Sequence, residues 1–188
     1  MIVKYPDNIE EIKKFAEEIG IDVKYLLGER YEGNLYLYSV ESLPDNIKFN
    51  IDGWLNLESV RALPENIKFD VGGYLNLNSV QCLPNNIVFN VGDWLNLGYV
   101  ESLPDNIVFN IGRSLYLTSV KSLPDNIVFD VGGSLYLSSV VSLPDNIVFN
   151  VGGFLDLSSV ESLPSNTIFN INEKIYFPID RKVKVIWN

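Results

Sequence analysis

The chain has 188 residues and a formal net charge of −10 at pH 7, with nearly half of its residues hydrophobic, no histidine and one cysteine. This length suits one domain with an apolar core. The acidic balance argues against nucleic acids and anionic membrane surfaces as partners, because both require clustered Lys and Arg. The lack of histidine removes the usual general base and most zinc sites, and one cysteine cannot form an intrachain disulfide. We therefore predict a protein that is not an enzyme and holds no metal or cofactor.

Residues 1–33 are predicted to form a helical cap and a lead-in to the rest of the chain. Asp7 followed three residues later by Glu10 is typical of the capping box at a helix N-terminus. Gly20 suits the helix C-terminus. The apolar residues between these two ends share one face of the expected helix: Ile9, Ile12, Phe15, Ala16 and Ile19.

The same segment bears on where the protein works. Its first residues lack the apolar core of a secretory signal, and no apolar run in the chain approaches the roughly 18 residues that span a bilayer. We therefore expect a protein of the cytoplasm, either of a bacterial cell or of its host.

Residues 34–173 contain seven copies of a 20-residue repeat without insertion or deletion. The first residue of each copy, position 1, is Asn34, Trp54, Tyr74, Trp94, Ser114, Ser134 or Phe154. Leu stands at positions 2, 4 and 10 of every copy, Val at position 7 and Phe at position 16. Alternation of apolar and polar residues at positions 1–5 and 14–18 predicts two strands in each copy.

The residues between these strands predict two corners. Pro-Asp-Asn at positions 11–13 forms one corner in most copies, and pairs containing Gly at positions 19–20 form the other. We expect the glycines to permit positive φ angles, and the Asn of position 13 to adopt left-handed backbone angles.

Twenty residues are too few for a helical crossover between two parallel strands. The sequence therefore predicts a mostly β fold, a parallel β-solenoid of seven coils whose strands pair with their equivalents about 4.8 Å away. Residues 174–188 are expected to cap its C-terminal end, with an edge strand at 182–187. We predict that the cap at 1–33, the repeats at 34–173 and the cap at 174–188 form one structural domain.

The pattern Leu-x-Leu followed by Leu-Pro resembles short leucine-rich repeats. It is similar to the 20-residue Leu-Pro repeats of bacterial type III effectors and, more closely, to repeats of hypothetical bacterial and phage proteins. The resemblance covers residues 34–173 and implies leucine-rich-repeat-like coils. Leucine-rich repeats usually place Asn three residues after the second Leu of Leu-x-Leu, where this chain has Val40 and its equivalents. Because its Asn column lies at position 13 instead, we expect two sheets and no regular helices on the convex side.

Aromatic residues gather at the outward positions of the first strand and its turn. They are Tyr36, Tyr38, Trp54, Tyr74, Trp94, Tyr99, Tyr116, Tyr136, Phe154 and Tyr176, with Asn56, Asn76, Asn78 and Asn96 between them. Tyr and Trp beside Asn and Ser are typical of binding surfaces. The alternative interpretation is that aromatic ladders only stabilise the sheet.

A second column stands at position 15 of the second strand. It begins with Lys48 and Lys68 and then becomes apolar: Val88, Val108, Val128, Val148 and Ile168. Two interpretations stay open. This stripe either forms the seam of a homodimer or another partner, or it reflects the strand propensity of Val and Ile.

Two smaller features favour structural interpretations. Cys82 stands in a column of small residues and is expected to be buried or half-buried. Asp105, Asp125 and Asp145 stack at position 12, where Asp suits the residue after Pro in a turn better than it indicates a Ca²⁺ site.

These observations lead to a functional hypothesis. We expect a non-enzymatic scaffold whose aromatic surface binds a protein partner, and the acidic field favours a basic one. By analogy with the effector and phage repeats, this would be an effector or an inhibitor of a host or bacterial defence protein. The alternatives are a carbohydrate-binding, adhesin-like solenoid and an acidic mimic of DNA.

Overall fold

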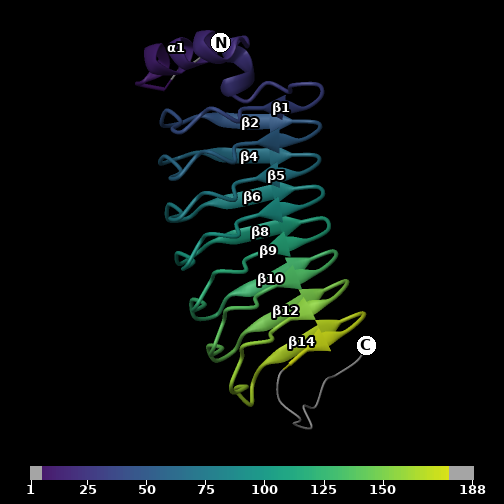
Figure 1. Ribbon diagram of the computed structural model, residues 1–188. Helices are drawn as coiled ribbons and strands as arrows, with labels where there is room; N and C mark the ends of the chain where they lie inside the picture. The colour runs from purple at the N-terminus through teal and green to yellow at the C-terminus, as the bar shows by residue number, and fades with distance from the viewer. Residues whose placement is uncertain (1–5, 178–188) are drawn as a thin grey trace.

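The computed structural model describes residues 6–177, which form a parallel β-solenoid of seven coils with a helix across its N-terminal end (Figure 1). Two sheets enclose the core. The seven-stranded sheet holds four-residue strands: β2 (Lys48–Ile51), β4 (Lys68–Val71), β6 (Val88–Val91), β8 (Val108–Ile111), β10 (Val128–Val131), β12 (Val148–Val151) and β14 (Ile168–Ile171).

The eight-stranded sheet holds two-residue strands: β1 (Leu35–Tyr36), β3 (Leu55–Asn56), β5 (Leu75–Asn76), β7 (Leu95–Asn96), β9 (Leu115–Tyr116), β11 (Leu135–Tyr136), β13 (Leu155–Asp156) and β15 (Ile175–Tyr176). The fold class predicted from the repeat is confirmed, including the two sheets and the lack of helices within residues 34–173.

Every strand pairs in parallel with its equivalent 20 residues further along, so identical columns of side chains stack in register. Leu35 pairs with Leu55 and Phe49 with Phe69. The strands are shorter than the alternation suggests, because the chain begins to turn at position 4. In each copy the amide of the position-7 Val donates to the carbonyl of the position-4 Leu, at 3.0–3.2 Å.

The core is a stack of equivalent side chains between the sheets. Six phenylalanine contacts run from Phe49 to Phe169, with ring centroids 5.4–6.0 Å apart and planes within 15° of parallel. The Leu residues of positions 2 and 4 and the Val of position 7 are almost all buried beside this stack, with most of the apolar residues of positions 10, 14 and 18. Burial of each such side chain stabilises the fold by roughly 1.5–3 kcal/mol. A single coil cannot bury these side chains, so this stabilisation arises only when coils stack.

The asparagine corner behaves as predicted in six of the seven copies, and Asn166 in the last copy is the exception. Asn46, Asn66, Asn86, Asn106, Asn126 and Asn146 all have φ between 57° and 61°. Apart from Gly, Asn is the residue that most readily enters this left-handed region. The backbone of the corner therefore accounts for Asn in these six copies.

The glycine corner differs from the prediction. Within residues 6–177, Gly has a positive φ only at Gly20, Gly28 and Gly33, all before the first repeat. The repeat glycines at position 19 instead permit close contact between coils. A Cβ on Gly112 would lie far inside contact distance of the Gly92 carbonyl oxygen, and Gly72, Gly92, Gly132 and Gly152 face the same obstacle. Glycine is needed at these five positions because the backbones touch, and a larger residue stands at position 19 only in the first and last copies, as Asp52 and Asn172.

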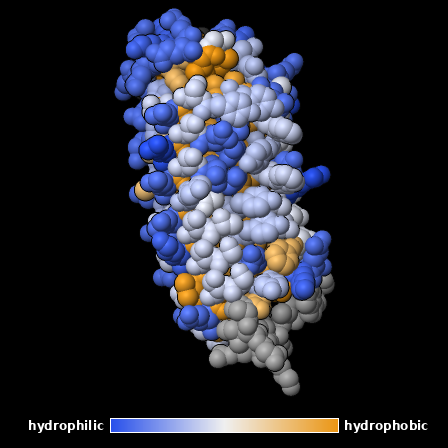
Figure 2. Space-filling view, viewed as in Figure 1, coloured by the Kyte–Doolittle hydropathy of each residue, from blue (hydrophilic) through white to orange (hydrophobic). Residues whose placement is uncertain are grey.

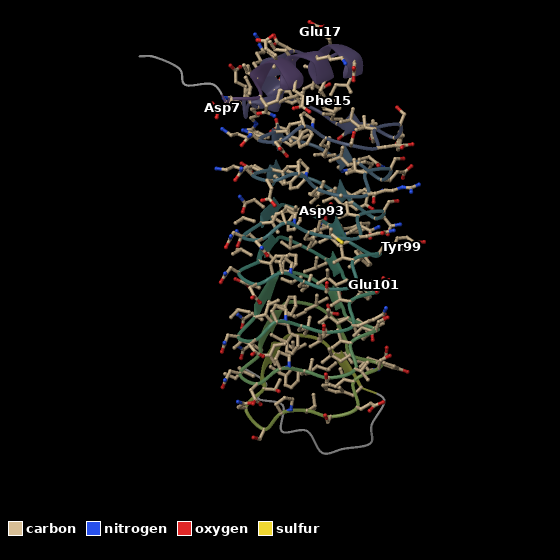
Figure 3. All side chains as sticks on the ribbon, turned by 90° about the vertical axis from the view of Figure 1, so that its left-hand side faces the viewer. Asp7, Phe15, Glu17, Asp93, Tyr99 and Glu101 are labelled. Carbon is tan, nitrogen blue, oxygen red and sulfur yellow. The ribbon has the colours of Figure 1, made fainter. Side chains whose placement is uncertain are left out.

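The N-terminal helix α1 (Ile9–Ile19) covers the first coil, as predicted. Ile12 and Ala16 are buried, and Phe15 lies on the side of the helix that faces the first coil, opposite Glu17 (Figure 3). Gly20 ends the helix with a left-handed φ of 73°. The predicted cap by Asp7 is wrong, because the helix begins after Asn8 and no side chain caps it. The Asn8 side chain bonds the first corner of the solenoid instead.

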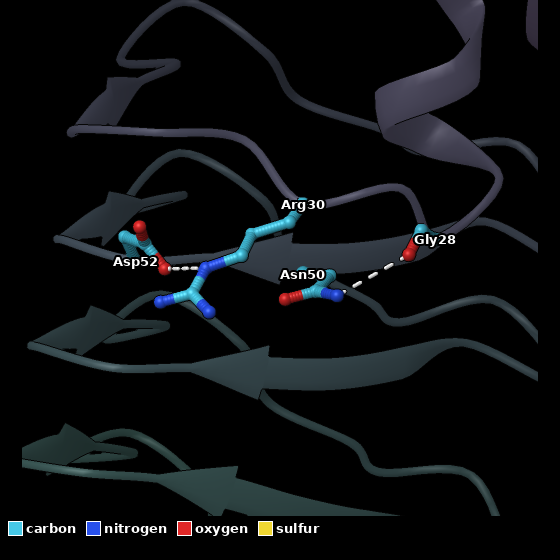
Figure 4. A network of polar contacts seen from close by, with 4 residues as sticks. All are labelled: Gly28, Arg30, Asn50 and Asp52. Carbon is cyan, nitrogen blue, oxygen red and sulfur yellow. Dashed lines mark hydrogen bonds and ion pairs between the residues drawn. The ribbon is translucent and has the colours of Figure 1, made fainter.

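The lead-in to the repeats is a short 3₁₀ helix, η1 (Val23–Leu26), followed by a partial coil. Leu27 and Tyr31 form isolated bridges to the first long strand. Polar contacts complete this junction: Asn50 donates to the Gly28 carbonyl at 3.3 Å, and Arg30 pairs with Asp52 (Figure 4). The expected edge strand at 182–187 lies outside the described residues.

Candidate binding surface

The ten predicted aromatic residues stand on the two-residue strands, directly before them or in the turn that follows them, and we call this outer surface the aromatic face. It is the face shown in Figure 2, where pale, ring-bearing side chains run along the rod beside bluer ones. Tyr36, Tyr38, Trp54, Trp94, Tyr99 and Tyr176 are exposed, and Tyr99 is the most open at 60 %. Tyr74, Tyr116, Tyr136 and Phe154 are half-buried. The sequence therefore placed these rings on one face, but they are not equally accessible.

Ring contacts explain the half-buried set. Tyr116 and Tyr136 stack with centroids 4.7 Å apart, and the chain of contacts continues through Phe154 to Tyr176 at 6.0 and 6.4 Å. Tyr74 meets the edge of Trp94 at 6.3 Å. In the C-terminal half of the face, these contacts fit the interpretation that aromatic ladders stabilise the sheet.

Two exposed rings of the face, Trp54 and Tyr99, lie outside these contacts. Within residues 6–177, neither Trp54 nor Tyr99 contacts another aromatic ring. The Trp54 amide donates to the Asn34 side chain at 2.7 Å, and its indole packs so closely over Gly73 that a Cβ there would collide with it. Trp54 is half exposed and yet held in place. Such a ring can bind a partner at little cost in conformational entropy.

The asparagines between the rings have a structural role that the sequence analysis missed. The side-chain oxygens of Asn56, Asn76 and Asn96 each accept a hydrogen bond from the backbone amide two residues on, at 2.9–3.1 Å. Asn76 is only 8 % exposed. These side chains cap the turns that follow β3, β5 and β7. The signal was Asn recurring at position 3, directly before the turn.

Burial raises the pKa of the Tyr116 hydroxyl above its usual value, and neighbouring Tyr136 adds to the shift. The folded protein therefore holds this proton more tightly than the unfolded chain does. The resulting stabilisation is fully present below the unfolded pKa of about 10 and is lost as pH rises through the folded pKa. We expect the melting temperature to fall less steeply above about pH 10 in Tyr116→Phe than in the wild type, as measured by circular dichroism. Tyr38→Phe, at an exposed position, is the matched control. The same slope of melting temperature against pH in the wild type and in both variants would contradict the expectation.

The predicted apolar column lies on the outer surface of the opposite sheet, and we call it the valine stripe. Val88, Val108, Val128 and Ile168 are exposed, with Val128 the most open at 53 %, and Val148 is half-buried. Lys48 and Lys68 continue the same column, exposed, toward the N-terminus. The stripe and the aromatic face lie on different sheets, so one partner molecule need not occupy both.

The two remaining candidates are Cys82 and the position-12 aspartates Asp105, Asp125 and Asp145. Cys82 is exposed, which corrects the expectation of a buried or half-buried side chain. Position 9 of the repeat lies on the outer side of the connecting turn, where the small-residue column faces solvent. Within the described part of the chain, no group of three or more acidic or cysteine side chains lies close enough together to hold a metal ion.

Comparison with other proteins adds no further evidence on family. Searches against protein-family models, curated proteins and solved structures each gave no match. Neither helix within residues 6–177 has the length and apolar character needed to cross a membrane. The resemblance to leucine-rich repeats of bacteria and phages therefore stays a prediction.

Proposed function

We propose that this protein is a non-enzymatic binding scaffold whose aromatic face contacts a protein partner. The observation that carries the proposal is the set of exposed rings on one sheet, above all Trp54 and Tyr99, which are 50 % and 60 % exposed. Large aromatic side chains are costly to leave in water and are enriched at the centres of protein interfaces.

The solenoid favours binding because it fixes the positions of these rings. Each short strand from β3 to β13 is bonded to the coils on both sides, for example by the Leu55 amide to the Tyr74 carbonyl at 2.8 Å. Binding of a partner would therefore cost little conformational entropy in this surface. A carboxylate stands beside the rings at Glu58, which accepts a hydrogen bond from the Asn76 side chain of the aromatic face at 3.4 Å. Together with the net charge of −10, it favours a partner that presents Lys or Arg to the rings.

The test compares Trp54→Ser/Tyr99→Ser with the wild type in affinity enrichment from a lysate of the source organism, quantified by mass spectrometry. Val141→Ser is the matched control, because Val141 is 42 % exposed but stands at position 8, outside both the aromatic face and the valine stripe. A partner of the face should be retained at least tenfold less by the double variant and equally by the control.

Melting curves test whether a loss of binding by the double variant results from a loss of folding. Neither ring is part of an aromatic ladder, so the double variant should melt within a few degrees of the wild type. If the double variant retains every protein that the wild type enriches, the proposal is wrong. If only glycans on an array show the loss, the face binds carbohydrate, which is the alternative class of ligand.

A further inference from the structure

Val88, Val108 and Val128 of the valine stripe line hollows in the outer surface of the long-stranded sheet, which we together call the trough. A hollow of about 730 Å³ lies between two neighbouring coils and is lined by Val108 and Val128 together with Asp105, Asp125 and Asp130. A similar hollow of about 460 Å³ lies nearer the N-terminus and includes Val88 and Lys68. The corner at positions 11–13 forms one wall of the trough, and position 17 forms the other.

The charges along the trough are unbalanced. Residues 74–173 contain only two basic side chains, Arg113 and Lys121. Each forms an ion pair, with Asp93 at 3.4 Å and with Glu101 at 2.7 Å. No ion pair within residues 6–177 involves the acidic residues beside the stripe, which are Asp105, Asp125, Asp130 and Asp145. An apolar floor with uncompensated carboxylates complements a surface that is both apolar and basic.

We propose that the valine stripe from Val88 to Ile168 is a docking site for a basic amphipathic helix of another protein. The apolar side of the helix covers the valines, and its Lys or Arg side chains reach the aspartates of the trough. The spacing is suitable, since coils repeat about every 4.8 Å and a helix rises about 5.4 Å per turn. Lys48 and Lys68 limit the site at its N-terminal end, because they would repel a cationic helix.

A second copy of the chain fits this trough poorly. If two rods pair in parallel, the Pro-Asp-Asn corners of one copy face position 17 of the other, which includes Asp130. If they pair antiparallel, the corners of the two copies face each other. Both arrangements bring carboxylates together in a molecule whose net charge is already −10. Charge therefore selects a basic partner over the homodimer that the apolar column alone also suggests.

The test uses a synthetic 18-residue helical peptide with Leu along one face and Lys on both sides of it. Fluorescence anisotropy measures its binding to the full chain at about 0.15 M salt. Val128→Lys should weaken binding at least tenfold. Val141→Lys makes the same change of charge and size at an exposed residue outside the stripe and should weaken binding less than twofold.

A second pair of variants tests the carboxylates. Asp125→Asn removes a charge in the trough, and Glu161→Gln removes one at position 8, outside it. Only the first should weaken binding, by about threefold or more. Circular dichroism confirms that the variants remain folded.

Three outcomes would overturn the proposal. The first is that the peptide does not bind the wild type. The second is that both members of each variant pair lose affinity equally. The third is that sedimentation shows a wild-type dimer, which Val128→Lys converts to a monomer. The second outcome would mean attraction by net charge alone. The third would assign the stripe to a second copy of the chain.

Discussion

Phe109→Ala should lower the free energy of unfolding by about 3–5 kcal/mol. Phe109 is 3 % exposed and stacks between Phe89 and Phe129, with ring centroids 5.9 and 6.0 Å away. Alanine would leave a cavity in the middle of the stack, and the coils on either side cannot close it because their strands are held in register. Urea unfolding followed by circular dichroism measures the change.

Val108→Ala is the matched control for this prediction, since Val108 precedes Phe109 in the same strand and points outward, 43 % exposed. It should cost less than about 1 kcal/mol, because little apolar surface is lost from the interior. Equal losses in the two variants would mean that the phenylalanine stack is not what holds neighbouring coils together.

Gly112→Ala should also destabilise the protein, by about 2–3 kcal/mol. Gly112 has no positive φ, so on backbone entropy alone the substitution would stabilise the fold by about 0.4–1 kcal/mol. The new methyl group, however, would collide with the Gly92 carbonyl, and backbone cannot move aside as a flexible side chain can. The sign of the measured change therefore decides between the two effects.

Gly98→Ala provides the comparison for Gly112→Ala. The nearest atom to its added Cβ is the Asn78 side-chain oxygen at 2.6 Å, which can rotate away. Other copies already hold Asn, Thr or Ser at this position. We expect Gly98→Ala to be as stable as the wild type or slightly more so in urea unfolding. If Gly112→Ala behaves in the same way, the coils are not held in backbone contact at position 19.

The fold was predictable because each copy repeats the same packing requirement. Five identical columns of Leu, Val and Phe specify which side chains face inward, and 20 residues leave room only for a coil. Strand length was not predictable in the same way. Leu37 and its equivalents alternate like strand residues and are buried, but their carbonyls accept the turn hydrogen bond. Periodicity reports the direction of a side chain and not the pairing of its backbone.

The glycines show a second limit of the sequence. A glycine needed for positive φ and a glycine needed for close approach look the same in a single chain. Only the neighbouring coil distinguishes them, and its distance is a tertiary property. The predicted start of the helix was wrong for a related reason. Asp7 followed by Glu10 fits a capping box, but the Asn8 side chain is held at the first corner by hydrogen bonds with Asp45 and Asn46.

The aromatic face was predictable as a set of positions but not as a set of accessible rings. Exposure depends on the residue one coil away. Tyr36 is exposed, whereas Tyr116 occupies the same repeat position and is half-buried against Tyr136. Likewise the asparagines at position 3 looked like surface polar groups until their bonds to the turn were known.

The in-register pairing of coils also has a consequence for how such a protein can change over generations. Because each coil contacts only its neighbours and each begins at the same residue of the repeat, gain or loss of 20 residues leaves every cross-section intact. Recombination between the repeated segments of its gene can therefore lengthen or shorten both outer surfaces in steps of about 4.8 Å. The length of the molecule and the residues on its two outer surfaces can thus evolve separately.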